Sequence, residues 1–161
     1  MLRIIKPERD QAAAGLRRKI SEKEIADLFK QGFDCGQVVL SSVADKIGLD
    51  MEKSYRLAAG FGGGMFRGQT CGAVVGAIMA LGMKYGHFEP DTPDRKNQMI
   101  AKVLEFQQRF MEKHKSTGCR DLLGYDVSKP DEMAIIEEKG LLLEFCPKVA
   151  ADAIKLLNEI L

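Results

Sequence analysis

The chain has 161 residues with 24 basic and 23 acidic side chains, which gives a formal net charge of +1 at pH 7. A chain of this length forms one domain whose core needs neither disulfides nor metal ions in order to fold. Because neither sign of charge dominates a long segment, the sequence excludes a basic footprint for nucleic acid or for an anionic membrane.

The first predicted elements are three short helices. Ser21 begins a capping box, in which its hydroxyl and a glutamate three residues later satisfy the free N–H groups of the first turn. A second helix is expected from Cys35, with Gly48 as its C-terminal stop, and Asp50 caps a third. These signals predict helical structure from residue 21 onward, preceded by a polar arm.

The middle of the chain combines a glycine-rich loop with an apolar helix. Five glycines fall within residues 60–68, a density that neither a helix nor a strand tolerates. The helix that follows is expected to run from Cys71 to about Tyr85, and small residues recur along one stripe at Gly72, Gly76 and Ala80. Such a stripe favours close approach of a neighbouring helix, and the near absence of charge predicts a buried central helix.

The later elements follow from caps and apolar periodicity. Thr92-Pro93-Asp94 begins a long amphipathic helix that reaches about Lys115. A short turn is expected over 118–124, and a small helix begins at Ser128-Lys129-Pro130 and ends near Gly140. Residues 141–145 show the one stretch with period-two alternation, and Pro147 occupies the first turn of a final helix.

These elements predict an all-α fold, a single-domain helical bundle with a buried central helix and a Gly-rich loop. Residues 1–20 are expected to form an N-terminal arm, and residues 21–161 the domain itself. The longest apolar run, from Cys71 to Met83, is shorter than the about 20 residues needed to cross a membrane. No apolar stretch follows Arg17-Arg18, so no export signal is expected and the predicted location is cytoplasmic, without membrane insertion.

Four cysteines, Cys35, Cys71, Cys119 and Cys146, each stand at a predicted helix start. A helix start offers free backbone N–H groups and the positive end of the helix dipole, and both favour a thiolate over a thiol. Thiolates bind metals and attack disulfides. Because disulfides rarely persist in the cytoplasm, the cysteines indicate metal binding or redox cycling.

The spacing of the cysteines narrows the chemistry. Intervals of 36, 48 and 27 residues contain no C-x-x-C pair, so compact zinc modules and thioredoxin-like sites gain no support. Helix starts that converge on one side of a bundle could hold an iron–sulfur cluster between four thiolates. Two alternatives stay open: a cofactor-free thiol/disulfide oxidoreductase with Cys71 as nucleophile, and a structural zinc site.

The cysteine pattern resembles the C_GCAxxG_C_C family of redox-active bacterial proteins. Cys35 matches the early cysteine, Cys71-Gly72-Ala73-Val74-Val75-Gly76 matches the Cys-Gly-Ala-x-x-Gly motif, and Cys119 and Cys146 match the two later cysteines. The resemblance covers roughly residues 22–160. It implies a redox-active protein with a bound prosthetic group such as an iron–sulfur cluster, similar to the non-haem part of split-Soret cytochromes. On this basis the domain over 21–161 is expected to be a redox domain.

The remaining features of the sequence are the glycine-rich loop, the two histidines and the methionines. The glycine-rich loop lacks the lysine of a phosphate-binding loop, because Gln69 stands in its place; the loop is expected to bring backbone amides to the sulfur of Cys71. His87 and His114 are predicted to be surface residues, and the methionines to fill the core. The expected partners are an unidentified redox protein and, in a homo-oligomer, further copies of the chain.

Overall fold

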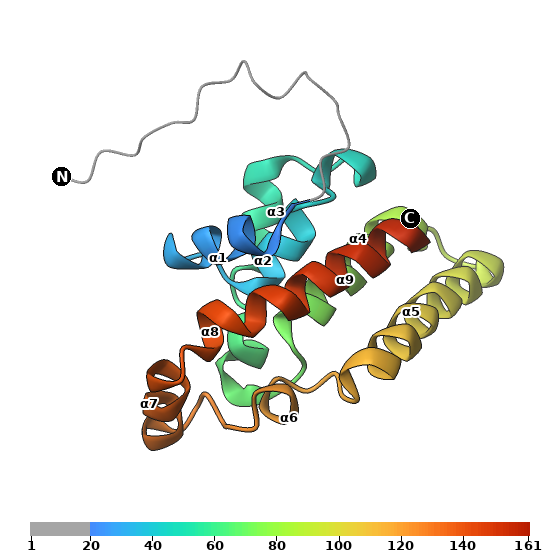
Figure 1. Ribbon diagram of the computed structural model, residues 1–161. Coiled ribbons are helices and arrows are strands. Elements are labelled where there is room, and N and C mark those ends of the chain that lie inside the picture. Colours follow the sequence, from blue (N-terminus) through green and yellow to red (C-terminus); the bar gives the residue numbers. More distant parts are fainter. Residues whose placement is uncertain (1–19) are drawn as a thin grey trace, which may run out of the picture.

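The computed structural model describes residues 20–161, and within this range the chain forms helices and no strand (Figure 1). In chain order the elements are α1 (Glu22–Lys30), α2 (Cys35–Ser41), the 3₁₀ turn η1 (Ala44–Ile47), α3 (Met51–Ala58), the turn η2 (Gly64–Gly68), α4 (Gly72–Tyr85), α5 (Pro93–His114), α6 (Cys119–Leu123), α7 (Pro130–Glu138), α8 (Leu141–Glu144) and α9 (Cys146–Ile160). The all-α prediction is confirmed. The predicted N-terminal arm lies, except for its last residue, outside the described residues.

Helix α4 lies at the centre of the bundle, packed against α2, α5 and α9 (Figure 1). Its inward side consists of small and aliphatic residues that are fully buried, among them Val74, Ala77 and Leu81. The opposite side of the helix reaches the surface, where the Met83 side chain is 51% exposed. The predicted central helix is therefore buried on one side only.

The closest helix packing in the core joins α2 to α4. A Cβ atom placed on Gly76 would lie 2.6 Å from the carbonyl oxygen of Gly36, a distance that real Cβ contacts do not reach. The two helices can cross at this separation only because both positions are glycine. The prediction that Gly76 serves close helix packing is confirmed.

The second helix is shorter than the sequence predicts, because two serines compete for its backbone. Ser41 Oγ donates to the Val38 carbonyl at 3.2 Å, and Ser42 Oγ donates to the Val39 carbonyl at 2.7 Å. Side-chain hydrogen bonds of this kind offer the carbonyls an alternative to the helical N–H groups. The chain ends α2 at Ser41 and continues as η1, which Gly48 closes in the left-handed region at φ +67°.

Two segments of the C-terminal third are short helices. The alternating stretch at 141–145 forms the helix α8, in which the consecutive residues Leu141 and Leu142 both pack against the small cluster around Ile136. A strand would send consecutive side chains to opposite faces. The predicted turn over 118–124 contains the one-turn helix α6, which begins at Cys119.

The glycines of α4 give a paired test of the helix crossing. We expect Gly76→Ala to lower the free energy of unfolding by about 1–3 kcal/mol, because the new methyl group meets the backbone of α2. Gly82 lies in the same helix with no atom within 4 Å of its would-be Cβ, so Gly82→Ala should leave stability unchanged or raise it by up to about 1 kcal/mol. Urea unfolding of both variants measures the difference; equal effects would contradict the assigned crossing.

Candidate functional site

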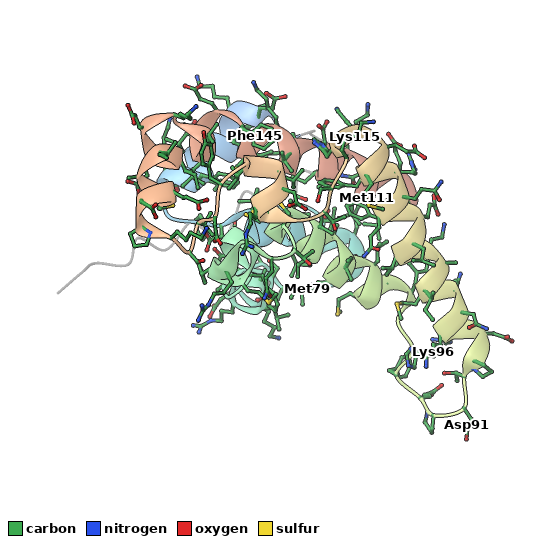
Figure 2. The ribbon with its side chains drawn as sticks, turned by 90° about the horizontal axis from the view of Figure 1, so that it is seen from below. Met79, Asp91, Lys96, Met111, Lys115 and Phe145 are labelled. Atoms are coloured by element: carbon green, nitrogen blue, oxygen red, sulfur yellow. The ribbon has the colours of Figure 1, made fainter. Side chains whose placement is uncertain are left out.

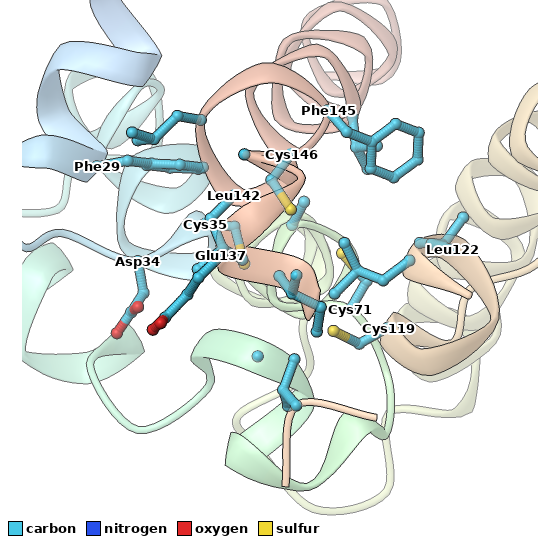
Figure 3. Close-up of a pocket in the computed structure, with 18 of the residues that line it drawn as sticks. Phe29, Asp34, Cys35, Cys71, Cys119, Leu122, Glu137, Leu142, Phe145 and Cys146 are labelled. Atoms are coloured by element: carbon cyan, nitrogen blue, oxygen red, sulfur yellow. The ribbon is translucent and has the colours of Figure 1, made fainter. Parts of the chain in front are cut away.

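The structure places all four cysteines at helix starts. Cys35, Cys119 and Cys146 are the first residues of α2, α6 and α9, and Cys71 is the residue that caps α4. The four helices come from widely separated parts of the chain, yet their N-terminal ends point toward one region (Figure 3). This region is the candidate site.

A short pairing of two extended segments brings α4 and α6 together. The Cys71 N–H donates to the Thr117 carbonyl at 2.8 Å, and the Cys119 N–H donates to the Gln69 carbonyl at 2.6 Å. Thr70 and Gly118 form an isolated antiparallel bridge between these bonds. Because the paired segments lead directly into the two helices, Cys71 and Cys119 begin their helices side by side.

Cys35 and Cys71 are the two cysteines of the site that are joined by a hydrogen bond. The Cys71 thiol donates a hydrogen bond to the Cys35 sulfur, which also accepts from the backbone N–H groups of Gly63 and Gly36. The glycine-rich loop was expected to direct its amides at Cys71. The structure corrects this expectation, because the loop amide at Gly63 reaches Cys35.

Gly72 makes room for this sulfur pair. A Cβ atom on Gly72 would lie 2.5 Å from Cys35 Sγ and 2.6 Å from the carbonyl oxygen of Phe61. Both distances are too short for any side chain at this position. The sequence assigned Gly72 to helix packing together with Gly76; in the structure its missing side chain serves the site directly.

The loop before α4 reaches Cys35 through a left-handed turn. Gly63, Gly64, Met65 and Phe66 are four consecutive residues with φ between 55° and 62°. Residues other than glycine pay about 1–2 kcal/mol each for this conformation, so Met65 and Phe66 are strained. The Gln69 N–H closes the turn by donating a hydrogen bond to the Gly64 carbonyl at 3.1 Å.

The four cysteines line a single cavity with a volume of about 410 Å³ (Figure 3). Most of its wall is aromatic or aliphatic, with Phe29, Phe33, Leu122, Leu142, Phe145 and Val149 contributing. The polar side chains in the wall are few, and they include Lys30, Asp34 and Glu137. An apolar cavity lined by four thiols is suited to a bound group that is held by sulfur ligands and shielded from water.

Hydrogen bonds and burial give Cys35 and Cys71 different pKa values. The hydrogen bond from Cys71 holds the pKa of Cys35 below its ordinary value against the opposing effect of burial, and the amides of Gly63 and Gly36 act in the same direction. The same hydrogen bond raises the pKa of Cys71 well above the ordinary range, and burial adds to the shift. Cys35 is therefore the thiol of the pair that ionises first.

The two remaining thiols are kept neutral mainly by burial. Burial raises the pKa of Cys119 to about 12, and the negative charges of Cys35 and Asp126 act in the same direction. Burial likewise raises the pKa of Cys146 to about 12, with the charges of Cys35 and Cys119 adding to it. At neutral pH Cys71, Cys119 and Cys146 are therefore thiols, and Cys35 is the first of the four to ionise as the pH rises.

Asp126 does not line the cavity, but its charge acts on Cys119, and the sequence did not reveal this influence. Its side chain is 5% exposed, and the carboxylate pairs with Arg120 at 2.9 Å. The N–H and hydroxyl of Ser128 both donate to it, at 3.0 and 2.7 Å, and these bonds lower its pKa. Asp126 lies in an irregular segment without periodicity or a motif, so no sequence signal could have identified it.

The histidine predictions are half right. His87 is exposed, as expected. The prediction for His114 is wrong, because its side chain is 11% exposed, its ring lies 4.6 Å from that of Phe110, and its Nε2 is 3.1 Å from Asp152 Oδ2. Neither histidine lines the cavity. Within residues 20–161, no three cysteine, histidine or carboxylate side chains lie close enough together to share a single metal ion.

These features define a helical protein built around a four-cysteine cavity. The family described as "Putative redox-active protein (C_GCAxxG_C_C)" matches residues 33–160, and the chain belongs to this family. Membership confirms the resemblance seen in the sequence and makes the protein a member of a redox-active family. Among curated proteins and solved structures, none matches the chain.

The order of the motif in this chain has a structural reason. The family name writes GCAxxG, whereas the chain has Cys71-Gly72-Ala73 and ends the motif at Gly76. Cys71 is free to cap α4, while position 72 has no space for a Cβ atom.

None of the helices within residues 20–161 has the length and apolar character required to cross a membrane.

The acidity of the thiols predicts their reactivity. In the reduced, cofactor-free protein at neutral pH, we expect iodoacetamide to modify Cys35 fastest, because its pKa is lowered and its side chain is only half-buried. Acidification through the pKa of Cys35 should slow this reaction. Cys119 and Cys146 should gain reactivity only as the pH rises toward about 12. Mass spectrometry of peptides after timed alkylation measures each rate.

A variant of Asp34 tests whether the pKa of Cys35 controls the rate of alkylation. The negative charge of Asp34 raises the pKa of Cys35, so Asp34→Asn should speed alkylation of Cys35 at a given pH. Asparagine is as good a helix-capping residue as aspartate, which keeps α2 in place. Faster modification of Cys71 than of Cys35 would contradict the proposed thiolate.

Proposed function

We propose that the protein binds an iron–sulfur cluster through Cys35, Cys71, Cys119 and Cys146 and that it transfers electrons. The observation that supports the proposal is the convergence of these four cysteines on one cavity, although 36, 48 and 27 residues separate them in the chain. Four cysteine thiolates are the ligand set of [2Fe–2S] and [4Fe–4S] clusters. When bound, such a cluster supplies a one-electron redox centre.

The chemistry and size of the cavity fit a cluster better than a single ion. The cavity is lined by cysteines from four helix starts and has a volume of about 410 Å³. A cluster presents separate iron atoms to its ligands, so its thiolates lie farther apart than the ligands of one ion. Sulfur atoms that line a cavity without meeting at one point are therefore compatible with a cluster.

Backbone amides and burial would tune such a centre. The N–H groups of Gly63 and Gly36 point at the Cys35 sulfur, and hydrogen bonds to ligand sulfur shift the reduction potential of a cluster. The apolar wall limits access of water. Because three of the four thiols are protonated at neutral pH, loading releases protons, and the affinity should increase as the pH rises.

Thiol–disulfide exchange is a second candidate function, favoured by the hydrogen-bonded pair of Cys35 and Cys71. In this alternative the two sulfurs cycle between a dithiol and a disulfide. From the sequence, Cys71 was predicted to be the nucleophile, and this role stays a prediction. The lowered pKa of Cys35 and the raised pKa of Cys71 favour Cys35 as the attacking thiolate and Cys71 as the resolving thiol.

The proposal carries expectations about partner and compartment. A buried redox centre needs a partner that donates or accepts its electrons. We expect this partner to be another redox protein. All four cysteines are present as free thiols. The cytoplasm stays the proposed location, because disulfides rarely persist there and cysteines in that compartment serve metal binding or redox cycling.

Single Cys→Ser variants at the four positions test the proposal. If all four sulfurs bind one cluster, each variant should lose most of its iron and sulfide, because serine oxygen is a poor replacement for thiolate. Iron, sulfide and zinc are measured after anaerobic purification, together with the visible spectrum. Val127→Thr is a matched control, since it adds a hydroxyl to the cavity wall without removing a sulfur; it should retain the iron.

Other outcomes would separate the alternatives. Full iron content in two or more of the four cysteine variants would contradict a single four-ligand cluster. Wild-type protein without metal, but with one reducible disulfide lost in Cys35→Ser and Cys71→Ser alone, would support thiol–disulfide exchange. Stoichiometric zinc with no visible absorption would support the structural zinc site.

A pair of glycine variants tests the positioning of Cys35. Gly72→Ala and Gly76→Ala each introduce a Cβ atom that meets a backbone oxygen at 2.6 Å, but only Gly72→Ala also meets Cys35 Sγ. We expect both to lower the melting temperature. Only Gly72→Ala should reduce bound iron severalfold at a temperature where both variants are folded. Equal iron content in the two variants would show that the position of Cys35 does not matter.

A further inference from the structure

Asp126 is the one charged residue that is buried within residues 20–161, since only 4% of its surface is exposed. It does not line the cavity, and the proposed function gives it no role. A buried carboxylate costs free energy unless its partners compensate for the lost hydration. The partners of Asp126 therefore indicate what it holds together.

The two oxygens of the Asp126 carboxylate have different partners. Oδ1 accepts from the N–H and the hydroxyl of Ser128, at 3.0 and 2.7 Å, and these bonds stay within one loop. Oδ2 pairs with the Arg120 guanidinium at 2.9 Å. The same guanidinium donates to the Arg67 carbonyl of η2 at 3.2 Å, so the Arg120 side of the carboxylate reaches beyond its own loop.

The backbone of η2 packs against this ion pair. Gly68 ends the turn in the left-handed region at φ +66°, and a Cβ atom placed there would lie 3.1 Å from Asp126 Oδ1 and 3.3 Å from Arg120 Cβ. At the start of the turn, a Cβ atom on Gly63 would lie 3.4 Å from Val127 Cγ2. The loop that carries Asp126 therefore contacts η2 at both ends.

The η2 turn needs support from its surroundings because its middle is strained and exposed. Met65 and Phe66 have φ values of 58° and 56°, and a strained backbone of this kind persists only where surrounding structure fixes it. Their side chains do not anchor the turn: Met65 was expected to fill the core but is 39% exposed, and Phe66 is 57% exposed. The support comes from the backbone hydrogen bond that closes the turn and from the loop after α6.

We propose that the ion pair of Asp126 and Arg120 is a clasp for the η2 turn. The clasp fixes the turn at the place where the Gly63 N–H donates to the Cys35 sulfur. Neither member of the ion pair lines the cavity, so both are positioning residues that act through the turn. The clasp requires no bound group; its effect on a cluster rests on the proposed function, in which a donor to ligand sulfur stabilises the reduced state.

Amide hydrogen exchange of the metal-free chain, followed by NMR, tests the clasp. Asp126→Asn retains the shape of the side chain and an oxygen for Ser128, but its amide nitrogen faces Arg120 and cannot accept a hydrogen bond. We expect the amides of Gly63 and Gln69 to exchange about tenfold faster or more in this variant, because η2 opens more often. Arg120→Gln should have the same effect, and it changes a side chain that is 55% exposed, so it provides a second test if Asp126→Asn does not fold.

Ser128→Ala is the matched control. It removes a hydrogen bond from the same carboxylate but leaves the pair with Arg120. The amides of η2 should then exchange within about twofold of their wild-type rates. The end of α5 near Asp91 and Lys96 provides an internal reference, because it projects away from the other helices (Figure 2) and its amides should exchange alike in every variant.

Three exchange results would overturn the proposal. Unchanged rates at Gly63 and Gln69 in both clasp variants would show that the turn does not need the ion pair. Equal acceleration in Ser128→Ala would assign the effect to a general loosening of the loop. Faster exchange at Gln69 alone would show that the clasp does not position the donor to Cys35.

The reduction potential of the cluster-bearing chain separates positioning from direct electrostatics. Loss of the Asp126 charge would by itself raise the potential, whereas loss of the Arg120 charge would lower it. Loss of the Gly63 donor lowers the potential in both variants, and it should dominate because this donor contacts a ligand sulfur while the ion pair lies outside the cavity. We therefore expect both variants to lower the potential and Ser128→Ala to leave it unchanged.

Shifts of opposite sign in Asp126→Asn and Arg120→Gln would overturn the proposal, because they would show that the charges act directly on the cluster. A wild-type chain that binds no cluster would contradict the proposed function instead. The exchange rates of the metal-free chain would still decide whether the clasp holds the turn.

Discussion

The arrangement of the site depends on the contact between α2 and α4, which three glycines permit. Gly36 and Gly76 allow the backbones of the two helices to touch, and Gly72 leaves the space that the Cys35 sulfur occupies. A side chain at any of these positions would separate the helices or displace the sulfur. Helix packing and site geometry therefore depend on neighbouring glycines, and the motif that contains Cys71 encodes both.

Burial and hydrogen bonds give the four cysteines different pKa values in spite of their similar positions. The helix starts were expected to favour thiolates at all four, yet only Cys35 combines a helix start with additional donors. At Cys119 and Cys146 the cost of placing a charge in an apolar cavity outweighs the helix dipole, since their pKa values rise to about 12. The dipole of a helix as short as α6 is a weak force beside desolvation.

The sequence was informative wherever local chemistry decides the structure. The capping box at Ser21, the cap at Asp50 and the proline at the start of α5 were all predicted correctly, because each depends on residues within one helical turn. The placement of cysteines at helix starts follows from the same signals. The all-α class followed from apolar periodicity along the whole chain.

Features that depend on tertiary contacts were not predictable. The burial of His114 requires knowing that α9 lies beside α5, and the pairing of residues 69–71 with 117–119 joins segments about fifty residues apart. The same holds for the roles of Gly72 and Gly76, which look equivalent on a helical stripe but face different neighbours. Sequence periodicity identifies the buried side of a helix without identifying what covers it.

The order in which the cysteines occur along the chain has a consequence for biogenesis. The last of them, Cys146, begins the C-terminal helix, which packs against α1, α2, α4, α5 and α8. During synthesis the cavity therefore lacks one wall until α9 has been made and has docked. A group held by all four sulfurs is completely bound only after α9 has docked, so its insertion is coupled to this step of folding rather than to the emergence of any single motif.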